Sequence, residues 1–191
     1  MAKVLVALFL ILGVCTLGSA HANIVNNSGF ETGDLTGWTA SGETGGDHVN
    51  VGGRGNSPHS GSYSVNIGST GPLGYITQDL NTIAGATYSL SFWLKNQDGP
   101  SNEFVINWGG ITLTDIVNSA AFSYTEYTFN NLLATSSITS LQFGVLQVPG
   151  WMNVDDISVV QTSNPVPIPG ALLLFGSGLV GLAGLRKKFR R

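Results

Sequence analysis

The chain has 191 residues, enough for one ordinary domain with targeting segments, and its charged fraction of 10% with 26 glycines argues against a helical bundle. All eleven acids lie between Glu31 and Asp156, whereas five of the eight bases lie in the last six residues. Residues 23–164 hold two bases against eleven acids, a formal charge of −9. Such a surface repels nucleic acid, which we exclude as a partner, and offers carboxylates to cations.

Residues 1–22 have the pattern of a signal peptide. One lysine precedes the apolar run Val4–Leu17, and small residues follow, with Ala20 and Ala22 placed as in an A-x-A cleavage site. We predict a helical leader that signal peptidase removes; the alternative, an uncleaved anchor, would need a longer apolar run. Cleavage also removes Cys15, the only cysteine, so the mature domain has no thiol, disulfide or cysteine-based metal site.

Residues 23–161 alternate short apolar runs with Gly-, Asn- and Ser-rich turns, which predicts an all-β domain. Tyr88, Leu90, Phe92 and Leu94 form the clearest stripe of period two and should face the core. Further strands are expected at residues 24–25, 63–67, 76–80, 104–108, 124–129, 141–146 and 154–160. About eight or nine strands in this length indicate a two-sheet β-sandwich.

The C-terminal residues form three segments. Residues 162–169 are a Pro-rich linker, which should be extended. Residues 170–185 are apolar and predict a transmembrane helix of about 24 Å, a little shorter than a hydrocarbon core of about 30 Å. Residues 186–191 are basic and should stay cytoplasmic. A plain stop-transfer anchor is the simplest interpretation of this pattern.

The order of these C-terminal pieces also resembles a known sorting signal. The motif Val166, Pro167, Ile168, Pro169, Gly170, followed by the apolar segment and the basic end, is similar to the PEP-CTERM signal, in particular to its VPLPA variant. The resemblance implies that a membrane-embedded exosortase processes the tail. The protein would then reach the envelope or exopolysaccharide of a Gram-negative bacterium. Ile168 stands where the namesake motif has Glu, which leaves the identity of the sorting enzyme open.

Three motifs in the middle of the chain resemble a second family. They are residues 23–31, leading to Gly37 and Trp38, residues 59–65, and residues 151–159. In this order and spacing they are similar to the galactose-binding-like jelly roll, in the style of carbohydrate-binding modules of families 4 and 9. The resemblance implies a jelly-roll β-sandwich and glycan partners.

That resemblance also implies a structural calcium ion that ties the N-terminal loop to the last strand. Its ligands would be Glu31 and either Asp155 or Asp156, with carbonyls near Gly29 and Gly61. Calcium prefers six to eight hard oxygen ligands, which an acidic domain supplies. Adjacent residues in a strand point to opposite faces, so only one of the two aspartates should contribute its side chain. The alternative is a turn-capping glutamate and a solvated aspartate.

Trp93, Trp108 and Trp151 are the candidates for stacking on a sugar ring. Trp93 is out of phase with the apolar stripe, so it should lie on the outer face of its sheet. Asn107 and Gln142 are polar residues on predicted strands and are candidates for hydrogen bonds to sugar hydroxyls. Core packing of the tryptophans and simple solvent exposure of the two amides are the alternatives.

No catalytic constellation is visible, and we predict that the protein is not an enzyme. The mature domain has only His48 and His59, without a visible third partner, and no Gly-x-Ser-x-Gly motif. We therefore expect an exported, exosortase-sorted protein of the envelope or exopolysaccharide with a carbohydrate-binding-like domain. A structural matrix or adhesin subunit without a glycan site and a small glycan hydrolase are the alternatives.

Overall fold

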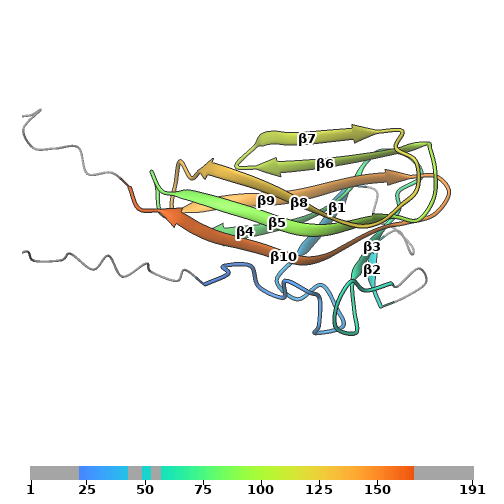
Figure 1. The fold of residues 1–191 in the computed structure, drawn as a ribbon, viewed down its shortest axis with the longest axis horizontal. Coiled ribbons are helices and arrows are strands. Elements are labelled where there is room, and N and C mark those ends of the chain that lie inside the picture. Colours follow the sequence, from blue (N-terminus) through green and yellow to red (C-terminus); the bar gives the residue numbers. More distant parts are fainter. Residues whose placement is uncertain (1–21, 43–48, 53–56, 166–191) are drawn as a thin grey trace, which may run out of the picture.

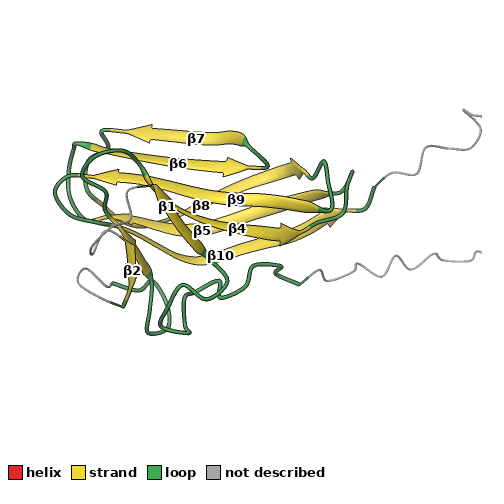
Figure 2. Cartoon of the chain, turned by 180° about the vertical axis from the view of Figure 1, so that it is seen from behind, coloured by secondary structure: helices red, strands yellow, loops and turns green. Residues whose placement is uncertain are grey.

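The computed structural model describes residues 22–42, 49–52 and 57–165, which form two antiparallel sheets packed face to face (Figures 1 and 2). The predicted all-β sandwich is confirmed. The expected leader helix and transmembrane helix lie outside the described residues. Within the described ranges, no helix has the length and apolarity needed to cross a membrane.

Sheet A has five strands in the order β1-β4-β9-β6-β7. In that order they are β1 (Thr39–Gly42), β4 (Gly74–Asn81), β9 (Ile138–Gln147), β6 (Asn102–Trp108) and β7 (Ile111–Val117). Every neighbouring pair is antiparallel. Strands β1 and β7, the two edges of this sheet, were not expected from the sequence. Strand β7 follows β6 after the turn Gly109–Gly110, where both residues have positive φ.

Sheet B also has five strands, in the order β2-β3-β10-β5-β8. In that order they are β2 (Val49–Val51), β3 (Val65–Ile67), β10 (Met152–Ser163), β5 (Thr87–Asn96) and β8 (Phe122–Leu133). The strand predicted at residues 24–25 is not formed. This segment instead runs beside β10 and is held there by a bond from Ile24 N to Val159 O (3.0 Å).

The core lies between the sheets, as the alternating burial of residues along β5 illustrates. Its residues Tyr88, Leu90, Phe92 and Leu94 are buried, as the alternating pattern predicts, while the residues between them are more exposed. The ring of Phe92 contacts those of Phe104 (centroids 5.9 Å apart) and Phe143 (5.1 Å). Because these two partners belong to sheet A, the aromatic contacts join the two sheets.

The N-terminal segment packs on the sandwich next to β4 and β10. The Gln78 side chain, 3% exposed, accepts a bond from Asn26 N (2.8 Å) and donates one to Asn26 O (3.0 Å). Phe30 is fully buried and its ring lies 5.7 Å from that of Trp38. These contacts hold the turn that carries Glu31 beside the last strand.

Candidate functional site

A row of polar side chains crosses the outer face of sheet A. The strand register aligns Thr39, Thr77, Gln142, Asn107 and Thr112 on five successive strands. Gln142 Nε2 donates to Thr77 Oγ1 (3.1 Å), Asn107 Nδ2 to Gln142 Oε1 (3.0 Å), and Thr112 Oγ1 to Asn107 Oδ1 (2.8 Å). Asn107 and Gln142, the two amides singled out in the sequence, are therefore brought together.

An aromatic ring lies beside this polar row. Tyr75 on β4 is opposite Gly144 on β9, on the same outer face. A Cβ atom built on Gly144 would lie 2.5 Å from Tyr75 Cε1, so the ring occupies the space above this glycine. Tyr75 is only partly buried. The sequence analysis did not identify this pair. The signal that could have found it is Gly144 itself, because glycine within a strand often marks the close approach of another group.

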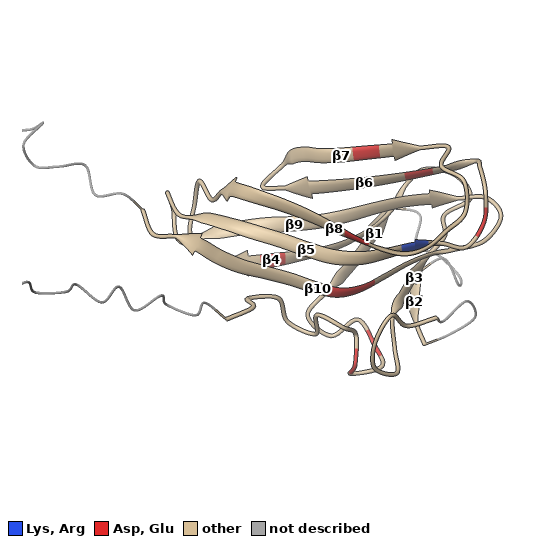
Figure 3. Cartoon of the chain, viewed as in Figure 1, with Lys and Arg blue, Asp and Glu red and all other residues tan. Residues whose placement is uncertain are grey.

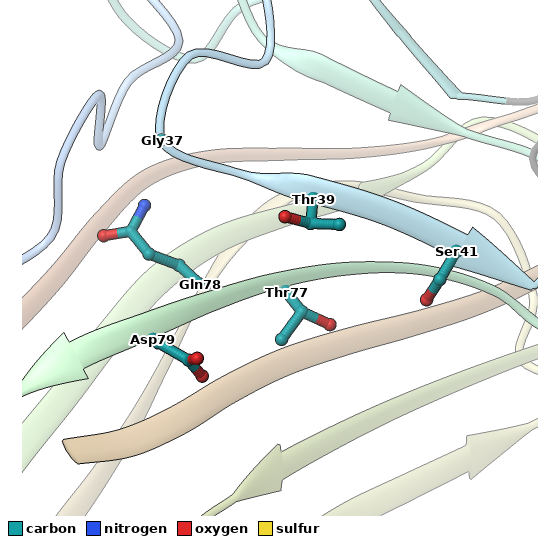
Figure 4. Close-up of a pocket in the computed structure, with 6 residues that line it drawn as sticks. All are labelled: Gly37, Thr39, Ser41, Thr77, Gln78 and Asp79. Atoms are coloured by element: carbon teal, nitrogen blue, oxygen red, sulfur yellow. The ribbon is translucent and has the colours of Figure 1, made fainter.

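A groove borders the same face at β1 and β4 (Figure 4). It has a volume of about 510 Å³ and is lined by Gly37, Thr39, Ser41, Thr77, Gln78 and Asp79. Two of its hydroxyls, those of Thr39 and Thr77, also belong to the polar row. The groove and the row therefore form one continuous surface of hydroxyl, amide and carboxylate groups around Tyr75, which we call the sheet A face.

The three candidate tryptophans do not share a surface. Trp108 is 3% exposed, packs on Tyr88 with ring centroids 5.7 Å apart, and donates from Nε1 to Leu133 O (3.0 Å). The prediction that it stacks on a sugar is therefore wrong, because its ring belongs to the core. Trp93 lies on the outer face of sheet B, and Trp151 lies in the loop before β10. Neither belongs to the sheet A face.

Trp93 already has an aromatic partner. The His59 ring stacks on it, with centroids 3.8 Å apart and an angle of 12° between the planes. His59 Nδ1 lies 2.7 Å from Asp156 Oδ2, and Ser60 Oγ donates to Asp156 Oδ1 (2.7 Å). Asp155 Oδ2 accepts the backbone N–H groups of His59 (2.8 Å) and Ser60 (3.3 Å). Residues 57–64 are thus clamped onto the outer face of sheet B.

A third carboxylate holds the other end of this loop. Glu31 accepts the backbone N–H groups of Ser62 (3.0 and 3.1 Å, to its two oxygens) and Tyr63 (3.0 Å). A Cβ atom at Gly61 would lie 2.3 Å from Glu31 Oε1, and Gly61 has a φ of +62°, so the approach requires glycine. The N-terminal turn, residues 57–64 and β10 are joined through carboxylate–amide bonds.

The two adjacent aspartates of β10 do not point to opposite faces. The pairing of β10 with β5 is irregular between Asp155 and Ser158, and Asp156 has a φ of +49°. As a result, Oδ1 of Asp155 and Oδ1 of Asp156 both lie 3.6 Å from a Cβ atom built on Gly29. The expectation that the two side chains point to opposite faces is wrong, because strand alternation is interrupted here.

The three acids named for calcium, Glu31, Asp155 and Asp156, therefore gather near Gly29. In the structure their oxygens accept bonds from N–H and O–H donors. Among the described residues, no group of three or more His, Cys, Asp or Glu side chains is arranged to hold a metal ion. Burial raises the pKa of the Asp155 carboxyl to about 6. Three backbone N–H groups donate to this carboxylate and favour its charged form, which partly offsets the rise.

His59 and Ser60 gain the third partner that the sequence did not show, Asp156. The arrangement differs from a nucleophile–base pair, because the Ser60 hydroxyl donates to the carboxylate rather than to the imidazole. The contacts of all three residues hold a loop in place.

Comparison with known families agrees with this architecture. A model of the Carbohydrate binding domain family (CBM_4_9) matches residues 22–143. The chain belongs to this family. The members of this family are carbohydrate-binding modules, which are binding rather than catalytic domains. No curated protein sequence matches the chain.

Solved structures show the same jelly-roll sandwich as this carbohydrate-binding domain. TmCBM61 in complex with β-1,4-galactotriose is 21% identical to this chain in sequence, with a TM-score of 0.60. The match covers 73% of this chain and 99% of the TmCBM61 chain. The K3 cleaved adhesin domain of Lys-gingipain from Porphyromonas gingivalis is 17% identical, with a TM-score of 0.54; the match covers 71% of this chain and 98% of that domain. The CBM22-1 xylan-binding domain from Paenibacillus barcinonensis Xyn10C is 17% identical, with a TM-score of 0.51; the match covers 75% of this chain and 97% of that domain.

We call the hydrogen bonds from residues 57–64 to Glu31, Asp155 and Asp156 the clamp. The clamp predicts a specific loss of stability on substitution. Asp155→Asn leaves a single side-chain oxygen for three backbone donors and places an amide N–H₂ among them. We expect the free energy of unfolding to fall by about 1–3 kcal/mol, measured by urea denaturation. The control Glu126→Gln, on an exposed residue of β8, should change it by about 0.5 kcal/mol or less. Equal effects of the two substitutions would contradict the clamp.

Proposed function

We propose that the domain binds a neutral glycan on the sheet A face, with Tyr75 as the stacking residue. The observation that carries the proposal is the ring of Tyr75 above Gly144, next to the hydrogen-bonded row of Thr77, Gln142 and Asn107. A pyranose offers an apolar C–H face and a rim of hydroxyls. An aromatic ring flanked by convergent amides and hydroxyls matches both.

The charge of this face favours neutral over acidic polysaccharides. Asp79, Glu103 and Asp115 lie on strands of sheet A, whereas Lys95, the single base among the described residues, lies on β5 of sheet B (Figure 3). Uronic acid or sulfate groups would approach carboxylates on a sheet that carries no lysine or arginine among the described residues, which costs electrostatic energy. Hydroxyl groups can bond to carboxylates, amides and threonines alike.

The clamp on sheet B argues against Trp93 as the sugar-binding residue. One face of its indole is covered by His59, whose position is fixed by Asp155 and Asp156. A sugar could stack there only after the loop had moved and these bonds had broken. On sheet A, Tyr75 is partly exposed, and no aromatic ring of the described residues stacks on it.

Glycan binding is tested on neutral polysaccharides. β-1,4-Galactan and xylan are the first probes, because the similar structures include domains bound to or named for these sugars. Tyr75→Ala should weaken binding about tenfold, or ~1.4 kcal/mol, in isothermal titration calorimetry or affinity electrophoresis. Gly144→Ala should also weaken it, because its Cβ would displace the Tyr75 ring.

Thermal midpoints of both variants show whether the fold is retained. Unchanged binding by Tyr75→Ala, or a loss found only with Trp151→Ala, would overturn the assignment of the sheet A face. Uniformly negative binding on a glycan array and on the host's own exopolysaccharide would favour the alternative, a structural matrix or adhesin subunit.

We further propose that the domain is not an enzyme, which agrees with its family of binding modules. Catalysis of glycoside hydrolysis requires two carboxyl groups on either side of the scissile bond. Asp155 and Asp156, the adjacent pair, are engaged by the backbone and side chains of residues 59 and 60. Sustained release of sugar product that one carboxylate substitution abolishes would support the hydrolase alternative instead.

Calcium binding at Glu31, Asp155 and Asp156 stays a prediction, supported by the gathering of these acids near Gly29. An ion there would screen the repulsion between Asp155 and Asp156, and binding to the folded state alone raises its stability. We expect the thermal midpoint to rise in calcium and to return to its starting value in chelator. An unchanged midpoint at saturating calcium would show that the clamp works without an ion.

For the whole chain we propose export, membrane anchoring and sorting. Signal peptidase would remove residues 1–22, the segment 170–185 would hold the precursor in the inner membrane, and an exosortase-type enzyme would act at residues 166–170. The domain, residues 23–161, would then reside in the envelope or extracellular matrix. The Pro-rich motif between an acidic domain and a basic-tipped apolar tail supports this order.

Intact mass spectrometry of cell fractions tests this processing. We expect the mature protein to begin at Asn23 and to have lost the residues that follow the Pro-rich motif. The precursor should be found in the membrane fraction and the shortened form in the envelope or matrix. A full tail in the final compartment would instead indicate a permanent anchor.

A further inference from the structure

One end of the sandwich differs in chemistry from the rest of the domain. The strand register places Asn81 opposite Ile138, and Thr87 opposite both Leu133 and Ser163, so several connections meet where β10 ends (left side of Figure 1). We call this region the tail end. It comprises the connections at residues 82–86, 109–110 and 134–137, the chain exit at residues 163–165, and the strand residues next to them.

The connections and the chain exit of the tail end contain no charged residue. The nearest charge along the chain is Asp79, two residues before the end of β4. The other acids of the described residues, and Lys95, lie further along the strands or toward the opposite end (Figure 3). In a domain this acidic, an uncharged end is a local exception.

Four large aliphatic side chains are exposed at this end. Ile83 is 49% exposed, Ile111 66%, Leu133 54% and Ile138 56%. They come from the β4–β5 connection and from β7, β8 and β9, so both sheets contribute. Asp79 is the charge nearest to them in the strand register: it lies opposite Ser140, two residues from Ile138 on the same outer face. A group of exposed aliphatics with so few charges is typical of a surface that contacts another apolar phase.

The chain leaves the domain at the same place. A Cβ atom built on Gly85 would lie 3.4 Å from Pro165 Cβ, which places Pro165 against the β4–β5 connection. The apolar segment begins only a few residues later, and the five residues 166–170 can span at most about 18 Å. A bilayer that contains the apolar segment therefore lies close to the tail end.

We propose that the tail end docks on the surface of the lipid bilayer, with Ile83, Ile111, Leu133 and Ile138 entering the boundary between headgroups and acyl chains. The inference rests on the proposed anchoring of residues 170–185. Aliphatic side chains are stabilised in this boundary layer, whereas carboxylates are repelled by anionic lipids. The strands then run away from the membrane, which leaves the sheet A face open to glycans.

The test uses the full chain with Cys15→Ser, so that one introduced cysteine carries an environment-sensitive NBD label. Thr135→Cys places the label at the tail end, and Ala121→Cys places it in the β7–β8 connection at the opposite end. The protein is reconstituted into vesicles of phosphatidylethanolamine and phosphatidylglycerol. We expect a blue shift and protection from iodide quenching for the label at position 135 and neither for the label at position 121.

The substitution at the tail end has a control at a side chain of equal exposure. Ile138 and Val117 are both 56% exposed strand residues, at the tail end and at the opposite end respectively. Ile138→Ser should increase iodide quenching at position 135, whereas Val117→Ser should leave the protection unchanged. Equal effects of the two variants would overturn the docking.

Vesicle flotation distinguishes this inference from the anchoring on which it rests. If the protein floats with the vesicles and iodide quenches the two labels equally, the proposed anchoring is supported and the docking is overturned. Loss of flotation overturns the anchor, and the docking with it, while the glycan-binding assay remains an independent test of the sheet A face. Protection that grows with the protein-to-lipid ratio would mean that a second copy covers the tail end, which also overturns the proposal.

Discussion

The contacts of Phe92 with Phe104 and Phe143 connect the two sheets, and the rest of the domain depends on them. The described domain contains no cysteine, so it relies on buried apolar surface rather than on a disulfide. Because side chains alternate along a strand, burying one set of residues decides which set faces outward. A slip of one residue in β4 would bury Tyr75 and expose its neighbour Ile76.

The last strand contributes the second constraint. Its irregularity after Asp155 turns two adjacent carboxylates toward residues 57–64, where they accept backbone and side-chain bonds. Buried carboxylates are costly unless they are hydrogen-bonded, and these bonds offset the desolvation of Asp155. The same contacts place His59 on Trp93, whereas Tyr75 on the outer face of sheet A is partly exposed without a stacked ring among the described residues.

The domain thus presents three surfaces of different chemistry. The outer face of sheet A is polar and carries Tyr75 above Gly144, the outer face of sheet B is covered by a clamped loop, and the tail end is uncharged and aliphatic. Each surface follows from the fold: turns at one end bring aliphatics from both sheets together, and register aligns polar residues from five strands. The proposed glycan binding, the stability of the clamped loop and the proposed orientation on the membrane would therefore involve separate parts of one small sandwich.

Much of the fold was predictable from local patterns. Alternation in β5 identified its buried face, and the short motifs at residues 23–31 and 59–65, within the matched residues 22–143, indicated the family that the comparison shows. Strands β1, β2 and β7 were missed. All three lie at the edge of a sheet, and β1 and β2 have only four and three residues. Trp108 was misassigned, because the residue type alone does not tell a buried ring from an exposed one.

The sequence by itself determined the all-β class, the acidic character of the domain and the positions of the acids that hold the loop. Only the tertiary structure decided which residues meet. Thr77 and Gln142 are 65 residues apart, and Glu31 and Ser62 are 31 apart. Periodicity is a property of neighbouring residues, whereas the register between distant strands is selected by burial of the common core. The sheet A face and the carboxylate clamp are both products of that register.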